Sequence, residues 1–224
     1  MTPWSSFNFK GLLINPYTQI VLNLTGTCFW SYYAYLIVSY FLSIDTYHPI
    51  HSTLALTYLL RNSLILVLFL FRHPAKDIST SGAALVAALL GTFSGFGYEW
   101  GQPPMFSMSS LSLNSLLAIR ICFSILILLA SFDLGKSFGI IPAIRKIKST
   151  NAYSIVRHPI YSCYLIFEAI GLFINFSSRN LMVWAIFTLS VVLRTYYEEK
   201  ILMTQREYKD YMTSVKYRFF YGIY

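Results

Sequence analysis

The chain has 224 residues, of which 56% are hydrophobic and only 12% charged, and its mean hydropathy is +0.55. Because a soluble domain carries roughly 25% charged residues, this composition excludes a disordered chain, a disulfide scaffold and an ordinary soluble enzyme. The 17 Lys and Arg residues outnumber the 9 Asp and Glu residues. Beside long apolar runs, this excess favours basic loops at a membrane surface over nucleic-acid binding.

Apolar runs recur along the chain, and a helix that crosses a bilayer needs about 20 such residues. Dipeptides that favour turns, such as His-Pro, Pro-Pro and Ser-Ser, lie between several of these runs. We therefore predict an all-α fold, a polytopic integral membrane bundle of about six transmembrane helices. The six runs lie within residues 17–44, 53–71, 79–97, 112–134, 160–176 and 181–197.

The loop charges predict how this bundle is oriented. Connections 45–52, 98–111 and 177–180 hold a single basic residue, Arg179, whereas the segments after the second, fourth and sixth runs are basic. Basic loops face the cytosol, so we expect both termini to be cytosolic. The basic segments contain Arg72 and Lys76; Lys136, Arg145, Lys146, Lys148 and Arg157; and Lys200, Arg206, Lys209, Lys216 and Arg218.

Other features of the runs predict packing and exclude two kinds of site. Four small residues in the third run recur every four positions, which predicts a close approach to a neighbouring helix. The three cysteines lie in apolar stretches without paired spacing, so neither a disulfide framework nor a metal site is expected. No removable signal peptide is evident, and we expect the first run to direct insertion. The small residues are Ala83, Ala87, Gly91 and Gly95, and the cysteines are Cys28, Cys122 and Cys163.

The most informative residues lie at the two ends of the last pair of runs. The sequence Arg-His-Pro-Ile-Tyr at 157–161 begins the fifth run, and Arg194 to Glu199 end the sixth. A short connection makes these two runs antiparallel neighbours, so both motifs face the same side. Arg194 and Glu198 are four residues apart and share a helix face. We expect a compact site at the membrane boundary, or else an ordinary surface ion pair between these two residues.

At these positions the chain resembles the isoprenylcysteine carboxyl methyltransferase family and the wider group of membrane phospholipid methyltransferases. The shared pattern is Arg-His-Pro-x-Tyr, a hydrophobic hairpin, Arg-x-x-x-Glu-Glu, then the tail residues Tyr208 and Tyr211 and a basic-aromatic ending at 217–219. It covers residues 136–224, an expected methyltransferase-like region with a cofactor loop, a helical hairpin and an amphipathic tail. Residues 1–135 form an expected N-terminal region of four spans.

The resemblance implies methyl transfer from S-adenosyl-L-methionine to a lipophilic substrate that enters from the bilayer, with S-adenosyl-L-homocysteine as product. The leading acceptor is a prenylcysteine-like carboxylate, which Arg194 would orient. An amine or thiol acceptor would need a base, for which Glu199, Tyr161 and His158 are the candidates. No metal or nucleic acid is implied. The implied cofactor contacts are Arg145, Lys146, Ile147, Lys148, Tyr153, His158, Pro159, Ile160, Tyr161 and Glu198.

The chain departs from the family pattern in ways that bear on the substrate more than on the cofactor. Cys163 stands where Gly is usual, and Tyr221 stands where Pro is usual. Asn151-Ala152-Tyr153 replaces Ser-Gly-x-Tyr, and residues 205–207 replace Phe-Gly before the tail tyrosine.

Several alternatives stay open. The acceptor is a carboxylate, a phospholipid amine, or the nitrogen or sulfur of a small molecule, and the membrane is the cell membrane or the endoplasmic reticulum. Sterol-reductase-like proteins that use NADPH share the Arg-His-Pro-x-Tyr hairpin, although Ile160 and the Ser162-Cys163 pair disagree with their usual pattern. A non-catalytic membrane protein is a third class.

Three charged residues lie in the middle of predicted spans, away from their ends, where ionisable groups are costly. They are Arg61, Arg120 and Glu168. We expect Glu168 to pair with Arg61 for structural reasons, in preference to lining a lipid-substrate tunnel. The tail aromatics are expected to form a belt at the membrane interface rather than a ligand-binding box.

Overall fold

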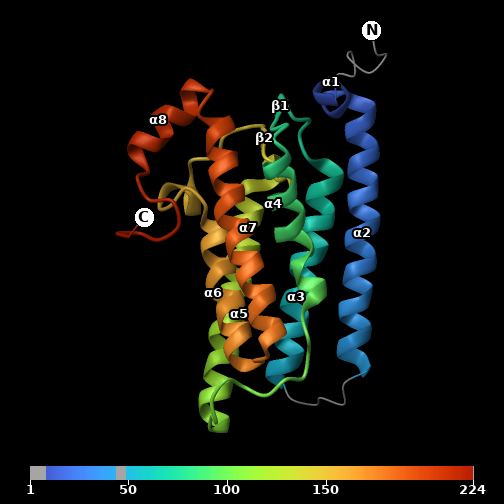
Figure 1. Ribbon diagram of the computed structural model, residues 1–224, viewed down its shortest axis with the longest axis vertical. Helices are drawn as coiled ribbons and strands as arrows, with labels where there is room; N and C mark the ends of the chain where they lie inside the picture. Colours follow the sequence, from blue (N-terminus) through green and yellow to red (C-terminus); the bar gives the residue numbers. More distant parts are fainter. Residues whose placement is uncertain (1–8, 44–48, 224) are drawn as a thin grey trace.

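The computed structural model describes residues 9–43 and 49–223, which form an elongated helical bundle (Figure 1). The end of the first predicted run at residue 44 and part of the connection 45–52 lie outside the described residues. In chain order the elements are α1 (Phe9–Ile14), α2 (Pro16–Ser43), α3 (Pro49–Phe71), β1 (Asp77–Ile78), α4 (Gly82–Phe93), η1 (Ser94–Gly97), α5 (Ser110–Leu134), η2 (Gly135–Ser137), β2 (Ala143–Ile144), η3 (Asn151–Ser154), α6 (Pro159–Ile174), α7 (Ser178–Leu202) and α8 (Arg206–Ser214).

Each predicted apolar run coincides with a helix, so the all-α fold class is confirmed at this level. Local signals fix several helix ends. The Ser109 hydroxyl accepts a hydrogen bond from the Ser112 backbone N–H, and Ser177 caps α7 through Asn180 in the same way. Helix α7 extends five residues beyond the predicted run, which places Glu198 and Glu199 within its last turns. The two-residue strands were not predicted, because so short a pairing has no sequence periodicity.

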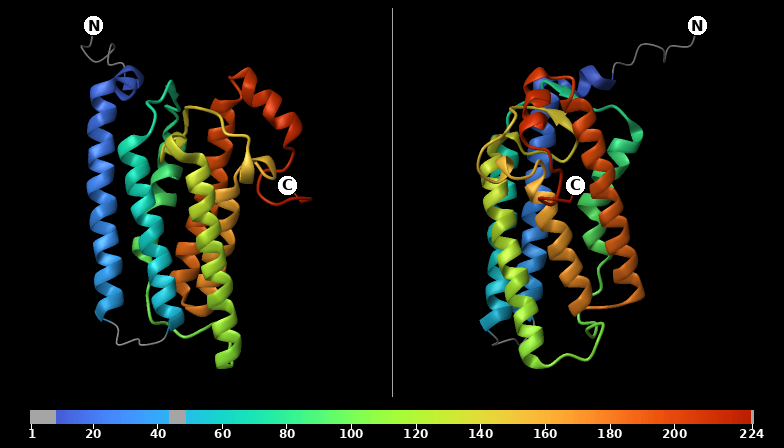
Figure 2. Two further views of the ribbon diagram at one scale, coloured as in Figure 1. Left: turned by 180° about the vertical axis from the view of Figure 1, so that it is seen from behind. Right: turned by 90° about the vertical axis from the view of Figure 1, so that its left-hand side faces the viewer.

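The helices pack in a continuous series. Helix α2 packs against α3, α3 against α5, and α5 against α6, while α4 packs against α7 and α7 against α6 (Figure 2). The core joins the two halves of the sequence, since Tyr58, Leu117 and Ile127 cluster with Tyr153, Ile160 and Phe167.

Small residues bring α4 close to α7, as predicted, but the buried positions differ in part. Ala84, Ala87 and Ala88 are buried, whereas Ala83 is exposed. A Cβ atom at Gly91 would lie 3.3 Å from the Cβ of Ser190 on α7. The contacting ridge therefore includes Ala87 and Gly91 but not Ala83, because a helix repeats every 3.6 residues and a four-residue series drifts around it.

One end of the bundle collects the loops that precede and follow the hairpin. Strand β1, after α3, pairs antiparallel with β2, after α5, through Asp77 opposite Ile144 and Ile78 opposite Ala143. Helix α1 contacts β1, and the C-terminal end of α7 and α8 lie at the same end (Figure 1). The basic segments that follow α3, α5 and α7 are thus on one side, as the charge pattern predicted. We call this side the outer end.

The helices differ in whether they are long enough to cross a bilayer. Among the described residues, one helical stretch, Ser110–Ser137, is long and apolar enough to cross a bilayer. Apolar stretches in three other helices, Leu56–Phe71, Gly82–Gly97 and Pro159–Ile174, are shorter. A 16-residue helix such as α6 spans about 24 Å, less than the roughly 30 Å of a hydrocarbon core.

The α4–α7 contact yields a prediction about stability. Replacing Gly91 by Leu should lower the free energy of unfolding by about 1–3 kcal/mol, because the side chain must displace Ser190 or separate the helices. Thermal unfolding of the purified protein measures the change. Gly82→Leu is the matched control, since a Cβ atom at Gly82 meets nothing within 4 Å. Equal destabilisation by the two variants would contradict this packing.

Candidate functional site

The α6–α7 hairpin brings its two motifs together at the outer end. Pro159 occupies the first turn of α6, where its missing N–H costs no helical hydrogen bond, and His158 precedes it. The Tyr161 hydroxyl donates a hydrogen bond to Glu198 Oε2 at 2.9 Å. The first turn of α6 and the last turns of α7 are therefore in direct contact, as the short connection predicted.

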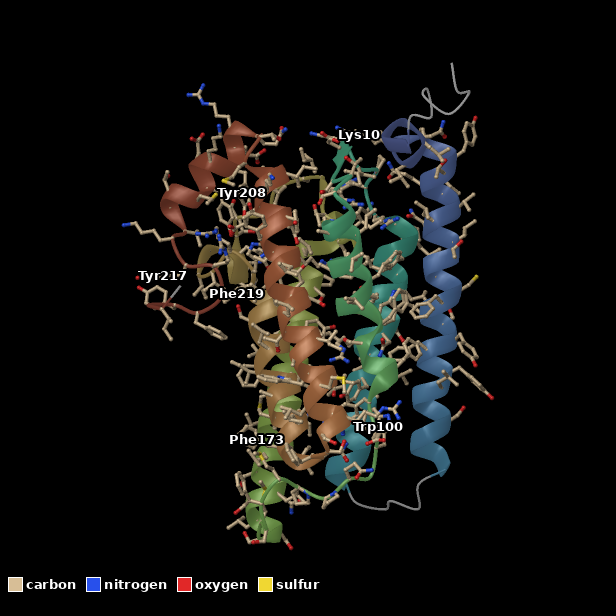
Figure 3. The ribbon with its side chains drawn as sticks, viewed as in Figure 1. Lys10, Trp100, Phe173, Tyr208, Tyr217 and Phe219 are labelled. Atoms are coloured by element: carbon tan, nitrogen blue, oxygen red, sulfur yellow. The ribbon has the colours of Figure 1, made fainter. Side chains whose placement is uncertain are left out.

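A cavity of about 260 Å³ extends from this contact into the bundle. Tyr208 on α8 and Trp100 near the opposite end both line it, and Figure 3 shows how far apart they lie along the bundle. Pro159 and Glu199 are the two predicted site residues that do not contribute to its wall. The predicted residues that line the cavity are Arg145, Lys146, Ile147, Lys148, Tyr153, His158, Ile160, Tyr161, Arg194 and Glu198.

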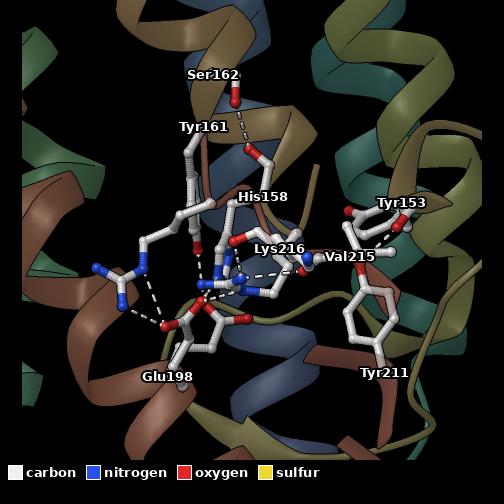
Figure 4. A network of polar contacts seen from close by, with 11 residues as sticks. Tyr153, His158, Tyr161, Ser162, Glu198, Tyr211, Val215 and Lys216 are labelled. Carbon is white, nitrogen blue, oxygen red and sulfur yellow. Dashed lines mark hydrogen bonds and ion pairs between the residues drawn. The ribbon is translucent and has the colours of Figure 1, made fainter. Parts of the chain in front are cut away.

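Glu199 faces away from the cavity and is enclosed by positive charge. Its side chain is only 2% exposed. Oε1 accepts a hydrogen bond from Arg157 Nε at 2.8 Å and lies 3.2 Å from His158 Nε2. Oε2 accepts hydrogen bonds from Arg218 Nε at 3.0 Å and Nη2 at 2.6 Å (Figure 4). Glu199, considered above as a tentative base, thus has the contacts of a positioning residue.

The electrostatics of Glu199 follow from these contacts. Burial by itself would raise the pKa of the Glu199 carboxyl, but the hydrogen bonds from His158, Arg218 and Arg157 outweigh it and hold the pKa well below its usual range. The carboxyl is therefore ionised at neutral pH and is not poised to accept a proton.

The chain after α8 binds along the start of α6, an arrangement that the sequence did not suggest. The backbone N–H groups of Arg157 and His158 donate to the carbonyls of Tyr217 and Arg218 at 2.9 and 3.0 Å. Arg157 Nη1 also donates to the carbonyls of Val215 and Lys216. Arg157 belongs to the basic segments expected to face the cytosol, but it is only 8% exposed, and its side chain holds the C-terminal segment.

Arginines form a positive wall on the other side of the cavity. Arg194 Nη2 donates to the Gly139 carbonyl at 2.5 Å, and the guanidinium lies 5.3 Å from the Tyr161 ring centroid. Burial and the nearby charge of Arg72 lower the pKa of Arg145 to about 10, so this group stays charged at neutral pH. Arg194 and Glu198, both within the described residues, form no ion pair with each other, which disagrees with the surface-pair alternative. The wall is suited to an anionic group.

Tail tyrosines complete the outer end of the cavity, contrary to the expected interfacial belt. Tyr208 and Tyr211 are 3% and 6% exposed and line the cavity, and α8 packs against Ile147 and Leu202. The Tyr211 hydroxyl donates to the Tyr153 carbonyl at 2.6 Å. The spacing Tyr-x-x-Tyr put both rings on one helix face, but it could not indicate that this face turns inward.

Two buried polar groups at the outer end of the cavity lack partners. The Tyr208 hydroxyl and Arg194 Nε form no hydrogen bond within the described part of the chain. Buried polar atoms are nearly always hydrogen-bonded, so these two mark places on the wall where a bound molecule, water included, would complete them.

The turn that carries Tyr153 depends on an asparagine. Asn151 has a φ of 55°, in the left-handed region that Asn and Gly tolerate best. Its side-chain amide donates to Asp133 Oδ1 at 2.9 Å, and the Ala152 N–H donates to Oδ2. The family pattern has Ser-Gly-x-Tyr here. Asn151 thus provides the backbone conformation that a glycine would allow.

The charged residues in the deeper part of the cavity, which we call its inner end, do not pair as expected. Glu168 lies 4.0 Å from Arg120 Nη2 and lines the cavity, whereas Arg61 is surrounded by aromatic rings. Arg120 also donates to the Tyr58 hydroxyl at 2.9 Å. A Cβ atom at Gly171 would lie 2.6 Å from Arg120 Nη2, so this glycine makes room for the guanidinium.

No protein-family model matches the chain, and no curated protein matches it. The resemblance to the isoprenylcysteine carboxyl methyltransferase family therefore stays a prediction from the sequence motifs.

The charge cluster around Glu199 yields a prediction. Glu199→Gln should lower the free energy of unfolding by about 3–5 kcal/mol, because it leaves Arg157 and Arg218 without a counter-charge in a buried place. Glu207→Gln, an exposed carboxylate in the first turn of α8, is the control and should change little. Thermal unfolding of both variants beside the wild type measures the difference.

The same pair of variants tests the pKa. A carboxyl with a lowered folded-state pKa stabilises the fold above its unfolded pKa of about 4.3, and this contribution is lost as the pH falls toward the folded value. The difference in stability between wild type and Glu199→Gln should therefore shrink below about pH 4. A difference that stays constant down to pH 2 would contradict the assigned ionisation.

Proposed function

We propose that this protein is an integral membrane methyltransferase that uses S-adenosyl-L-methionine and acts on a lipophilic acceptor. The observation that carries the proposal is the single cavity that joins the Arg-His-Pro-x-Tyr and Arg-x-x-x-Glu-Glu motifs at the outer end to an aromatic interior. In such a cavity the cofactor can approach from the aqueous side, while the lipophilic acceptor enters from the bilayer through the bundle.

The residues at the outer end fit a nucleoside with a charged amino-acid part. Glu198 is a carboxylate acceptor suited to hydroxyl or amino groups, while Lys146 and Lys148 suit a carboxylate. The faces of Tyr153 and Tyr161 favour a nearby cation. The unpartnered Tyr208 hydroxyl adds a buried hydrogen-bonding group that such a ligand satisfies. When bound, S-adenosylmethionine supplies the methyl group from its sulfonium.

The chain's own part in the reaction is positioning and exclusion of water. Methyl transfer is an in-line displacement, for which alignment of the two reactants supplies much of the rate. A carboxylate acceptor is ionised near pH 7 and needs no base, which agrees with a site whose buried Glu199 is already neutralised by arginines. Arg194 would hold that acceptor through its free Nε edge. We therefore favour carboxyl O-methylation of a prenylcysteine-like acceptor over an amine or thiol.

The proposal that the bundle spans a membrane rests on its surface and its charges. Large apolar side chains are exposed on several helices, as expected of surfaces that face lipid. The basic segments at the outer end would then face the cytosol, in the cell membrane or the endoplasmic reticulum. Exposed apolar residues on α2, α5 and α7 include Ile20, Val21, Leu24, Leu111, Ile119, Ile125, Leu126, Leu129, Phe132, Leu189 and Val192.

Cofactor binding is the first test. Detergent-purified protein should bind S-adenosylhomocysteine saturably, and Glu198→Gln should weaken binding by roughly tenfold or more, because a charged acceptor is lost. Arg194→Gln should keep binding but abolish methyl transfer to a lipid extract in the presence of radiolabelled S-adenosylmethionine. Calorimetric titration and product counting are the two measurements.

The control for Glu198 is Glu207→Gln, which removes the same charge from an exposed position. If Arg194→Gln loses cofactor binding as fully as Glu198→Gln, the division of roles is wrong. Saturable binding of NADPH without binding of S-adenosylhomocysteine would instead assign the site to a reductase. Chemical identification of the labelled product names the acceptor.

Tyr208→Phe separates ligand binding from packing. In the ligand-free protein it removes a buried hydroxyl without a partner, so stability should stay the same or rise by about 1 kcal/mol. Binding of S-adenosylhomocysteine should weaken by about fivefold, since the bound state loses a hydrogen bond. Thermal unfolding with and without the ligand measures both effects. A variant that is destabilised yet binds normally would show that Tyr208 only packs.

A further inference from the structure

The inner end of the cavity contains two buried arginines and one glutamate. Arg61 is 6% exposed and Arg120 is 3% exposed, and both line the cavity together with Glu168. Glu168 lies 4.0 Å from Arg120, so one positive charge in this group has no counter-ion among the described residues. A buried charge that is not neutralised is strongly unfavourable, and natural proteins pair such groups.

Arg61 is the residue without a counter-ion. Its guanidinium carbon lies 4.6 Å from the Tyr58 ring centroid, 5.1 Å from that of Phe167 and 5.3 Å from that of Tyr164. Its Nε and Nη1 atoms form no hydrogen bond within the part of the chain that the structure describes. The rings attract the charge but accept no hydrogen bonds of ordinary strength, so these two donor atoms of Arg61 stay unused.

Arg157 illustrates the alternative within the same molecule. It is buried to a similar degree, and its guanidinium is bonded to the Glu199 carboxylate and to two backbone carbonyls. An arginine with a purely structural role is satisfied in this way. Arg61 is buried to a degree comparable with Arg157, but it borders a cavity instead of such partners.

The position of Arg61 differs from that of Arg194. Tyr161 and Tyr164 are three residues apart on α6, and Glu168 follows at the next turn, so one helix face lines the cavity. Arg194 contacts the Tyr161 ring, whereas Arg61 contacts the Tyr164 ring, about 4.5 Å farther along the helix. A group bound to Arg61 therefore lies deeper in the bundle than the proposed methyl acceptor.

We propose that the inner end of the cavity is a binding site for one carboxylate of a lipophilic ligand, with Arg61 as its counter-ion. A single carboxylate balances the net charge of Arg61, Arg120 and Glu168, and its two oxygens match the edge of a guanidinium. The surrounding rings accommodate the apolar part of the ligand. The inference deepens the proposed function and rests on it: besides the group that is methylated beside Arg194, the acceptor would carry a carboxylate that enters first and lies at Arg61.

The test compares an acid with the matching alcohol and methyl ester. Three of the four tryptophans, Trp30, Trp100 and Trp184, line the cavity, so brominated ligands that enter it quench fluorescence. In detergent at pH 7.5, 9,10-dibromostearic acid should bind at least about tenfold more tightly than 9,10-dibromostearyl alcohol or the methyl ester, since only the acid is ionised.

Four variants locate the preference. Arg61→Gln should remove the preference for the acid over the alcohol, and Arg61→Lys should retain part of it. Glu168→Gln should increase this preference by raising the positive charge of the site. Glu207→Gln, which changes an exposed carboxylate outside the cavity, is the control and should leave the preference in place. Equal binding of acid and alcohol by the wild type overturns the proposal, and so does a preference that survives in Arg61→Gln or is lost in Glu207→Gln. If Arg61→Gln does not fold, the wild-type ratio and the direction of the Glu168→Gln change decide.

Titration of S-adenosylhomocysteine on the same preparations separates this inference from the proposed function. Acid preference without cofactor binding would reject the methyltransferase proposal and keep the inner site. Cofactor binding without acid preference would reject the inner site alone.

Discussion

The buried carboxylate of Glu199 is the group on which the geometry of the outer end depends. It receives hydrogen bonds from the start of α6 through Arg157 and from the C-terminal segment through Arg218, and it contacts His158. The guanidinium groups of Arg157 and Arg218 repel each other in a place where water screens little, so the anion is what allows them to converge. A single side chain near the end of α7 therefore fixes the relative position of three segments that are distant in the sequence.

This arrangement separates the tasks of two adjacent acids. Consecutive residues on a helix point about 100° apart, so Glu198 and Glu199 cannot both face the cavity. Glu199 neutralises the buried cations, and Glu198 is left to accept from Tyr161 and to line the cavity. His158 is held by Glu199 and stacks on Tyr161, with ring centroids 5.5 Å apart. The cavity wall is thus held in place by a charge cluster that shares Arg157 and His158 with it.

Sequence reasoning predicted the local features and missed the long-range ones. Helical periodicity and a short connection suffice to place Tyr161 beside Glu198. The contact between Arg218 and Glu199 depends on how the tail returns over α6, and no local pattern encodes it. The choice of Arg120 rather than Arg61 as the neighbour of Glu168 is decided by the space at Gly171, which only packing reveals. Helix ends were predicted less well: α6 ends at Ile174, two residues before the end of the predicted run, because hydrophobicity continues into an extended loop, whereas α7 continues five residues past its predicted run.

Buried donors without acceptors are found on the cavity wall at several depths. Arg61, Arg194 and Tyr208 lie on α3, α7 and α8, at different depths, and each has a buried donor without an acceptor on the wall of the same cavity. Each such group costs about 1–3 kcal/mol, so three of them consume a considerable part of the 5–15 kcal/mol by which a fold is usually stable. Their gathering on one surface, beside a charge cluster in which Arg157 and Arg218 are bonded to Glu199, is what a cavity adapted to polar ligands requires. Arg194 and Tyr208 at the outer end suit a polar group near the proposed cofactor, whereas Arg61 suits an anion within the aromatic interior. The cavity therefore favours ligands that carry a polar group at each end.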